Sequence, residues 1–218
     1  MRSNVVHPEP LMKKRVYDLA AQEASRHMSS RNFKAAIGAS LCALKLGTEL
    51  SENLMALYFQ LSEANLGLGK LQIAKDFLQL AQANFAGRHD GGPKQDQITD
   101  GLAMEISLNR ILGKIELAQG NQREAIRALA QSVYLAGELY GTCSFETGSN
   151  LAALAEGFGS VGDPKKARHC YRKILEIASV WTNPLSELQQ QEFKSILSSE
   201  YCTELKIPDH LVGDSSAN

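Results

Sequence analysis

The chain has 218 residues, of which 44% are hydrophobic and 6% aromatic, and its 23 basic and 24 acidic residues give a formal net charge of −1. This composition is that of a folded chain with a buried core, and the abundance of leucine and alanine favours helices over sheets. With charge so evenly balanced, nothing favours electrostatic attraction to nucleic acid or an anionic membrane, and we expect neither as a partner.

Apolar residues recur at helical spacing along most of the chain, which predicts an all-α protein. In chain order the expected helices are 11–29, 33–47, 52–68, 71–86, 98–119, 122–140, 145–161, 164–181 and 185–203. Residues 1–10 are expected to be a flexible N-terminus and residues 206–218 a flexible tail. The range 11–205 is then predicted to be one helical-repeat domain.

A break at Gly120-Asn121 divides the apolar stretch from Gly113 to Leu129 into two helices. A glycine inside a helix costs about 1 kcal/mol relative to alanine, so this break is interpreted as a turn. Gly120 can end one helix in the left-handed conformation and Asn121 can cap the next. Similar turns recur at Arg31–Ile37, Gly69–Ala74 and Gly162–Ala167, which predicts four helix hairpins.

Small residues stand at fixed distances from the alanine that opens each second helix. We expect them to let paired helices cross closely. The predicted packing residues are Ala24, Ala36, Ala43, Ser62, Ala74, Ala81, Gly113, Ala125, Ala155 and Ala167. These positions resemble the tetratricopeptide repeat family. The resemblance implies an α-solenoid of four helix hairpins, which the helix at 185–203 would cap at its C-terminal end.

The spacing between the aligned alanines is longer than the family's repeat of about 34 residues. The largest excess falls on Ala86–Asp96, whose glycine, proline and charged residues predict a loop. Longer repeats with the turn Leu139–Thr142 resemble those of the kinesin light chain type.

No pattern for catalysis or for metal binding stands out. The four cysteines, Cys42, Cys143, Cys170 and Cys202, are far apart and lack zinc spacing. Gly67-Leu68-Gly69-Lys70 lacks the second half of a phosphate loop and is interpreted as a repeat turn. The sequence therefore predicts no catalytic residue, no metal and no cofactor. The N-terminus has no apolar signal core, so we expect a cytoplasmic protein or one bound to an intracellular structure.

Five exposed groove positions are candidates for binding another protein, because the first helices of successive repeats line a concave surface in this family. They are Phe59, Glu63, Arg110, Lys114 and Glu156. Phe59 could anchor a partner, and Arg110 and Lys114 could receive a carboxylate. The alternative is that Phe59 packs between repeats and the two cations are solvated. The residues of a chaperone-binding carboxylate clamp are absent, since those positions carry Ala21, Ser25 and Gln60.

A closer resemblance is carried by Leu61–Gly69 followed by Ala74, Phe77-Leu78 and Ala81–Ala83, and by Leu139–Thr142 and Tyr171–Ile177. These segments are similar to the repeat region of the MYND domain-containing protein 12 family, without its zinc finger. The resemblance implies a noncatalytic subunit of the ciliary or flagellar axoneme within a hetero-complex. Its partners would be an inner-arm dynein heavy chain, a second tetratricopeptide protein and the doublet microtubule. The alternative is a soluble adaptor that binds a peptide of cargo or chaperone machinery in its groove.

Overall fold

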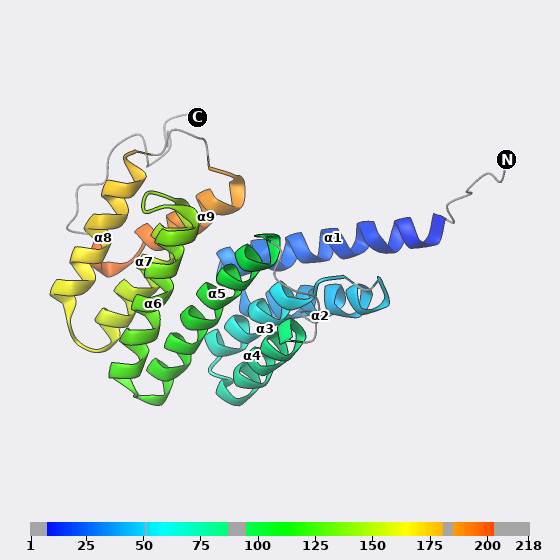
Figure 1. Ribbon diagram of the computed structural model, residues 1–218, viewed down its shortest axis with the longest axis horizontal. Coiled ribbons are helices and arrows are strands. Elements are labelled where there is room, and N and C mark those ends of the chain that lie inside the picture. The colour runs from blue at the N-terminus through cyan, green and yellow to red at the C-terminus, as the bar shows by residue number, and fades with distance from the viewer. Residues whose placement is uncertain (1–7, 51, 87–94, 181–184, 203–218) are drawn as a thin grey trace. The chain divides into compact units, whose positions relative to one another are not determined.

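The computed structural model describes residues 8–50, 52–86, 95–180 and 185–202 (Figure 1). These residues form α-helices and one short 3-10 helix, and none of them lies in a strand. The all-α prediction is therefore confirmed for this part of the chain. The first helix begins at Pro8, inside the segment 1–10 that was expected to be flexible. The predicted tail at 206–218 and most of the loop at Ala86–Asp96 lie outside the described residues.

Two compact units make up the chain, Met1–Gly91 and Gly92–Asn218. The sequence predicts one domain over 11–205, whereas the division falls within the predicted loop at Ala86–Asp96. This is the place where the spacing between repeats exceeds the family value most.

The N-terminal unit contains two helix hairpins. Helix α1 (Pro8–Ser29) packs against α2 (Phe33–Leu50), and α3 (Met55–Gly67) packs against α4 (Leu71–Ala86). The two hairpins pack against each other through contacts between α2 and α3. Part of the core lies where Ala43, Leu54 and Leu57 meet Tyr17 and Leu44.

The C-terminal unit contains two further hairpins and a terminal helical segment. Helix α5 (Gln95–Gln119) packs against α6 (Gln122–Tyr140), and α7 (Phe145–Ser160) packs against α8 (Pro164–Ala178). Helix α7 also contacts α5, α6 and α9 (Glu187–Leu197), and the 3-10 helix η1 (Glu200–Cys202) contacts α8.

The four hairpin turns share one backbone hydrogen-bond pattern. In the third hairpin, Gly120 N–H donates to the Leu117 carbonyl at 3.0 Å and Asn121 N–H donates to the Glu116 carbonyl at 2.9 Å. This pair of bonds closes the end of a helix around a left-handed residue, and Gly120 has a φ of 83°. The corresponding residues, Arg31, Gly69 and Gly162, also have positive φ and make the same two bonds. The break at Gly120 is therefore a repeated structural turn.

All ten residues that the sequence assigns to packing are buried. Ser62 shows how a polar member of the set is accommodated, because its hydroxyl donates to the Ala74 carbonyl at 2.7 Å between α3 and α4. Buried hydroxyls need such a partner, since an unmade hydrogen bond costs about 1–3 kcal/mol.

Leu129 explains why Gly113 and Gly157 are glycines. A Cβ atom on Gly113 would lie 2.6 Å from Leu129 Cγ, and one on Gly157 would lie 2.7 Å from Leu129 Cδ1. Both distances are too short for carbon atoms. The absent side chains on α5 and α7 therefore make room for the Leu129 side chain of α6.

The terminal segment covers the last hairpin of the C-terminal unit. Ser186 and Gln189 form a reciprocal capping box at the start of α9. Phe193 of α9 and Cys202 of η1 are buried in one apolar cluster with Ala153, Tyr171 and other residues of α7 and α8. A sequence range predicted as one helix, 185–203, thus becomes a helix followed by a 3-10 turn.

Candidate interaction surface

Two of the predicted groove residues lie on α3, and one of them is buried. Phe59 is 8% exposed, so its ring presents almost no surface to a partner and belongs to the core. Glu63, one turn further along, is half-buried and interacts with another group of the chain. The prediction of Phe59 as an exposed anchor fails because its aromatic ring fills interior space, as the alternative interpretation required.

The other three groove candidates belong to the C-terminal unit. Arg110 and Lys114 lie one turn apart on α5 and are half-buried, whereas Glu156 on α7 is exposed. Each of the three already interacts with another group of the chain. A carboxylate arriving from a partner would have to compete with those existing interactions.

The polar residues of α1 and α3 are also engaged with each other. Gln60 Nε2 donates to Ser25 Oγ at 2.8 Å, and Ser25 Oγ donates to the Ala21 carbonyl at 3.2 Å. Asp18 lies 3.4 Å from Lys14 Nζ. The residues at the clamp positions thus bond within the unit.

The outer face of α1 is apolar and exposed, and the groove prediction did not include it. Met12, Val16 and Leu19 are 64%, 48% and 61% exposed, and Leu11 beside them is 51% exposed. The spacing of four and then three residues aligns Met12, Val16 and Leu19 on one side of the helix. We call these four residues the α1 stripe. Ala20 and Ala24, which pack or are buried, lie on another side.

The α1 stripe is visible in the sequence as a second apolar periodicity. Within 11–29 the buried alanines account for one helical face, and Met12, Val16 and Leu19 form another at i, i+4 and i+7. A helix at the edge of a bundle needs only one apolar face for its own packing. The additional face is therefore unexplained by the N-terminal unit alone.

Two of the three basic residues at 13–15 form ion pairs with α2 and the segment after it, and the third, Arg15, lies beside the α1 stripe. Lys13 Nζ lies 3.2 Å from Glu49 at the end of α2, and Lys14 Nζ lies 2.6 Å from Glu52, which lies between α2 and α3. Hydrogen bonds to Glu49 and to Glu52 raise the pKa of Lys13 and of Lys14, respectively. Arg15 is exposed and has no ion pair with a described residue.

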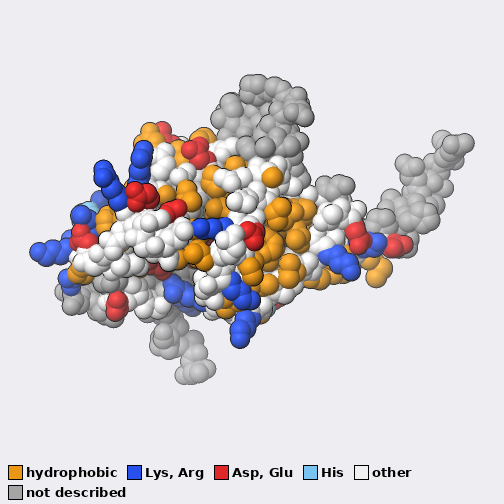
Figure 2. Space-filling view, turned by 90° about the horizontal axis from the view of Figure 1, so that it is seen from below, with side chains coloured by type: hydrophobic (Ala, Val, Ile, Leu, Met, Phe, Trp, Pro, Cys, Tyr) orange, Lys and Arg blue, Asp and Glu red, His pale blue; other side chains and the backbone are white. Residues whose placement is uncertain are grey.

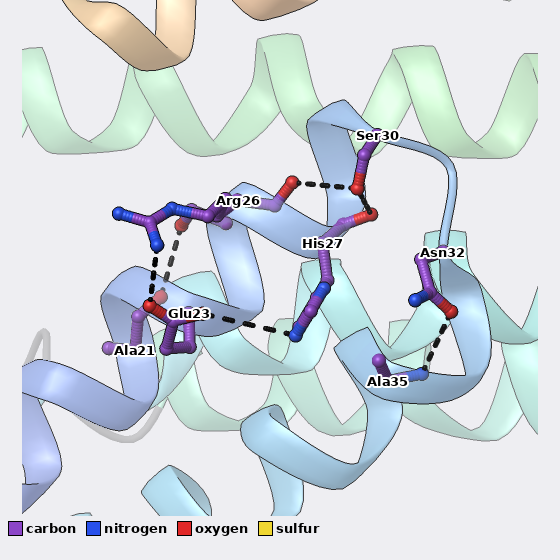
Figure 3. A network of polar contacts seen from close by, with 8 residues as sticks. Ala21, Glu23, Arg26, His27, Ser30, Asn32 and Ala35 are labelled. Carbon is purple, nitrogen blue, oxygen red and sulfur yellow. Dashed lines mark hydrogen bonds and ion pairs between the residues drawn. The ribbon is translucent and has the colours of Figure 1, made fainter.

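Figure 3 shows the polar contacts at the C-terminal end of α1. Glu23 pairs with Arg26 at 3.0 Å and lies 3.9 Å from His27 Nε2. Ser30 Oγ donates to the carbonyls of Arg26 and His27, at 3.1 and 3.2 Å. The charges at this end of α1 are therefore used locally, and they border the α1 stripe at its C-terminal end.

The other motifs from the sequence have structural roles among the described residues. The turn Gly67–Lys70 is one of the four hairpin turns, and Lys70 N–H donates to the Asn65 carbonyl at 2.9 Å. His169 and Cys170 are neighbours in the sequence and could suggest a catalytic pair, but His169 is exposed and Cys170 is buried, so the two side chains do not face one another. No group of three metal-binding side chains occurs in this part of the chain, and its four cysteines are free.

None of the helices in the described ranges is both long and apolar enough to cross a membrane. Hydrophobic, basic and acidic side chains all reach the surface shown in Figure 2. No protein-family model matches this chain.

Proposed function

We propose that this protein is a noncatalytic scaffold that binds other proteins, and that the α1 stripe is one of its docking surfaces. The observation that carries the proposal is the exposure of Met12, Val16 and Leu19 on the outer face of α1. Clusters of exposed apolar side chains mark protein interaction sites more often than scattered ones do. Burying about four such side chains in a partner provides a hydrophobic centre of the kind that dominates binding energy.

The partner surface is expected to be apolar with a carboxylate at its edge. Arg15 lies next to the α1 stripe along the helix and has no ion pair with a described residue. A carboxylate placed there would complement the guanidinium and orient the partner. An amphipathic helix of another protein meets both requirements.

For the architecture, we infer a tetratricopeptide-like arrangement within each unit. The repeated turns support this, because four hairpins with the same hydrogen bonds and buried small residues at the same positions are what such repeats require. In the inferred arrangement, α1 is the first helix of the first of these four hairpins.

The cellular role that we propose is that of a subunit of the ciliary or flagellar axoneme associated with inner-arm dynein, beside a second tetratricopeptide protein. The support for this role is the sequence resemblance, carried by segments such as Leu61–Gly69 and Tyr171–Ile177. The groove-binding adaptor is the second choice, because Phe59 is buried and the predicted cations already have interaction partners.

Affinity purification from ciliated cells tests both parts of the proposal. The tagged protein, its Val16→Asp variant and its Val180→Asp variant would be recovered from separate detergent and salt extracts and analysed by mass spectrometry. Val180 is 55% exposed and provides the same substitution in the C-terminal unit. We expect inner-arm dynein and a repeat protein in the salt extract, and a reduction of about tenfold or more for Val16→Asp alone.

Two results would count against the proposal. Equal recovery with all three proteins would exclude the α1 stripe as the docking surface. Recovery only in the detergent extract, with kinesin or chaperones, would favour the groove-binding adaptor.

A further inference from the structure

Helix α8 concentrates positive charge in a chain whose formal net charge is −1. From its N-cap Asp163 to its last residue Ala178 it has only two carboxylates, those of Asp163 and Glu176. Five cations stand against them, namely Lys165, Lys166, Arg168, Arg172 and Lys173, and His169 lies among these.

Three of these side chains form an exposed line on α8. Lys165, His169 and Arg172 are all exposed and follow one another at i, i+4 and i+7, so they share one helical face. We call them the α8 basic face. Neither Lys165 nor Arg172 has an ion pair with a described residue.

The neighbouring cations already have partners on the helix. Lys166 Nζ lies 2.9 Å from Asp163 and 5.3 Å from the centre of the Phe158 ring, and Lys173 Nζ lies 2.6 Å from Glu176. Both carboxylates have lowered pKa values, because Lys166 bonds Asp163 and Lys173 bonds Glu176. Asp163 also attracts Lys165, and Glu176 also attracts Arg172, but over a longer range than an ion pair. With five cations against two carboxylates, α8 keeps an excess of positive charge.

This charge arrangement does not favour the helix itself. Lys165 and Lys166 stand in the first turn of α8, where the helix dipole favours acidic side chains. Arg168 and Arg172 are one turn apart, and like charges at that spacing are destabilising. A helix selected for stability alone would place these cations nearer its C-terminus.

We propose that the α8 basic face binds an acidic polypeptide segment in an extended conformation. Lys165 and Arg172 are separated by a rise of about 10 Å along the helix. An extended segment advances about 3.3 Å per residue, so carboxylates three residues apart match this separation. A polynucleotide is the less suitable ligand, because the α8 basic face is short and the chain as a whole carries no excess of positive charge.

Fluorescence anisotropy with a labelled oligoglutamate peptide tests this inference on the full chain. The variants are Lys165→Glu/Arg172→Glu and, as a control with the same change of charge, Arg123→Glu/Arg127→Glu. Arg123 and Arg127 are exposed and one turn apart on α6. Far-UV circular dichroism establishes that each variant has kept its helices.

We expect the wild type to bind the peptide and to lose affinity as salt rises, because the Debye length falls from about 30 Å at 0.01 M to about 8 Å at 0.15 M. The α8 double variant should lose about tenfold in affinity and the α6 control much less. Equal losses in the two variants, no binding by the wild type, or stronger competition by single-stranded DNA than by unlabelled peptide would each overturn the proposal. This test does not depend on the α1 stripe.

Discussion

The two units differ in how far the first and the last helix hairpin, in chain order, are covered by other residues of the same unit. In the C-terminal unit, α9 and η1 cover the last hairpin and bury Phe193 and Cys202 against it. In the N-terminal unit, the first helix leaves the α1 stripe in contact with solvent. Helical repeats require a polar or covered outer face to remain soluble. The comparison indicates that this chain provides its own cap for one hairpin, and we infer that a partner covers the other.

The largest expected effect is on the covered hairpin. We expect Phe193→Ala to lower the free energy of unfolding of the C-terminal unit by about 3–5 kcal/mol, because it leaves a cavity under α9. Val16→Asp in the α1 stripe should change stability much less, by about 0.5 kcal/mol, because Val16 is already 48% exposed. Urea unfolding followed by circular dichroism measures both. Similar losses for the two variants would contradict the distinction between a covered and an open hairpin.

A second prediction concerns the close packing of the C-terminal unit. Gly157→Ala should cost about 1–3 kcal/mol, because its Cβ would lie 2.7 Å from Leu129 Cδ1. Gly38→Ala is the control, since a Cβ on this glycine of α2 meets nothing within 4 Å. The control should gain about 0.5–1 kcal/mol from helix propensity. Thermal unfolding measures the melting temperature of both variants. If Gly157→Ala were as well tolerated as Gly38→Ala, the close contact between Gly157 and Leu129 would be contradicted.

The thiol of the cap makes the stability of the C-terminal unit depend on pH. Burial raises the pKa of Cys202 from 9.0 to about 11. The folded thiol thus stays protonated where the unfolded thiol ionises, so its contribution is complete below about pH 9 and is lost as the pH rises to about 11. We expect a loss of up to about 2 kcal/mol over this range.

Chemical unfolding at several pH values would measure this loss. The Cys202→Ala variant should lose less stability than the wild type between about pH 9 and 11, whereas a variant of the exposed Cys143 should follow the wild type. An unchanged pH profile in Cys202→Ala would mean that the thiol is accessible to solvent.

The smallest effects distinguish two buried serines of the N-terminal unit. Ser62 Oγ donates to the Ala74 carbonyl, so Ser62→Ala should cost about 1 kcal/mol. Ser40 Oγ is buried without a hydrogen-bond partner, so Ser40→Ala should be neutral or gain up to about 1 kcal/mol. The urea midpoint should fall for Ser62→Ala and should stay unchanged or rise for Ser40→Ala, and a similar fall in both variants would show that the hydroxyl contacts do not decide their stability.

The helices and turns could be predicted because their signals are local. Gly120 marks a turn by its own conformational preference, and the alanine register locates the buried contacts of paired helices. Asn121 stands at the N-cap position of α6 as expected, but its side chain makes no capping bond and donates instead to Glu116 Oε2. The burial of Phe59 could not be predicted in this way. The same position in the helical repeat is compatible with an aromatic side chain that points to the core and with one that points to a groove. Burial depends on neighbouring helices, which no local pattern specifies.

The α1 stripe was predictable in part. Its i, i+4, i+7 spacing is visible in the sequence, but a second apolar face is equally consistent with a helix buried on two sides. The structure distinguishes these cases, since Met12 and Leu19 are more than half exposed. Likewise, the need for glycine at 113 and 157 could be recognised only once the position of the Leu129 side chain was known.

Photo-crosslinking in ciliated cells is the most direct test of the central claim that α1 docks a partner. A photoreactive phenylalanine derivative would replace Leu19 in one protein and Val180 in another, and the crosslinked products would be identified by mass spectrometry. We predict that position 19 forms a covalent product with another protein, an inner-arm dynein subunit or a second repeat protein, and that position 180 does not. Products from position 180 but none from position 19 would contradict the account.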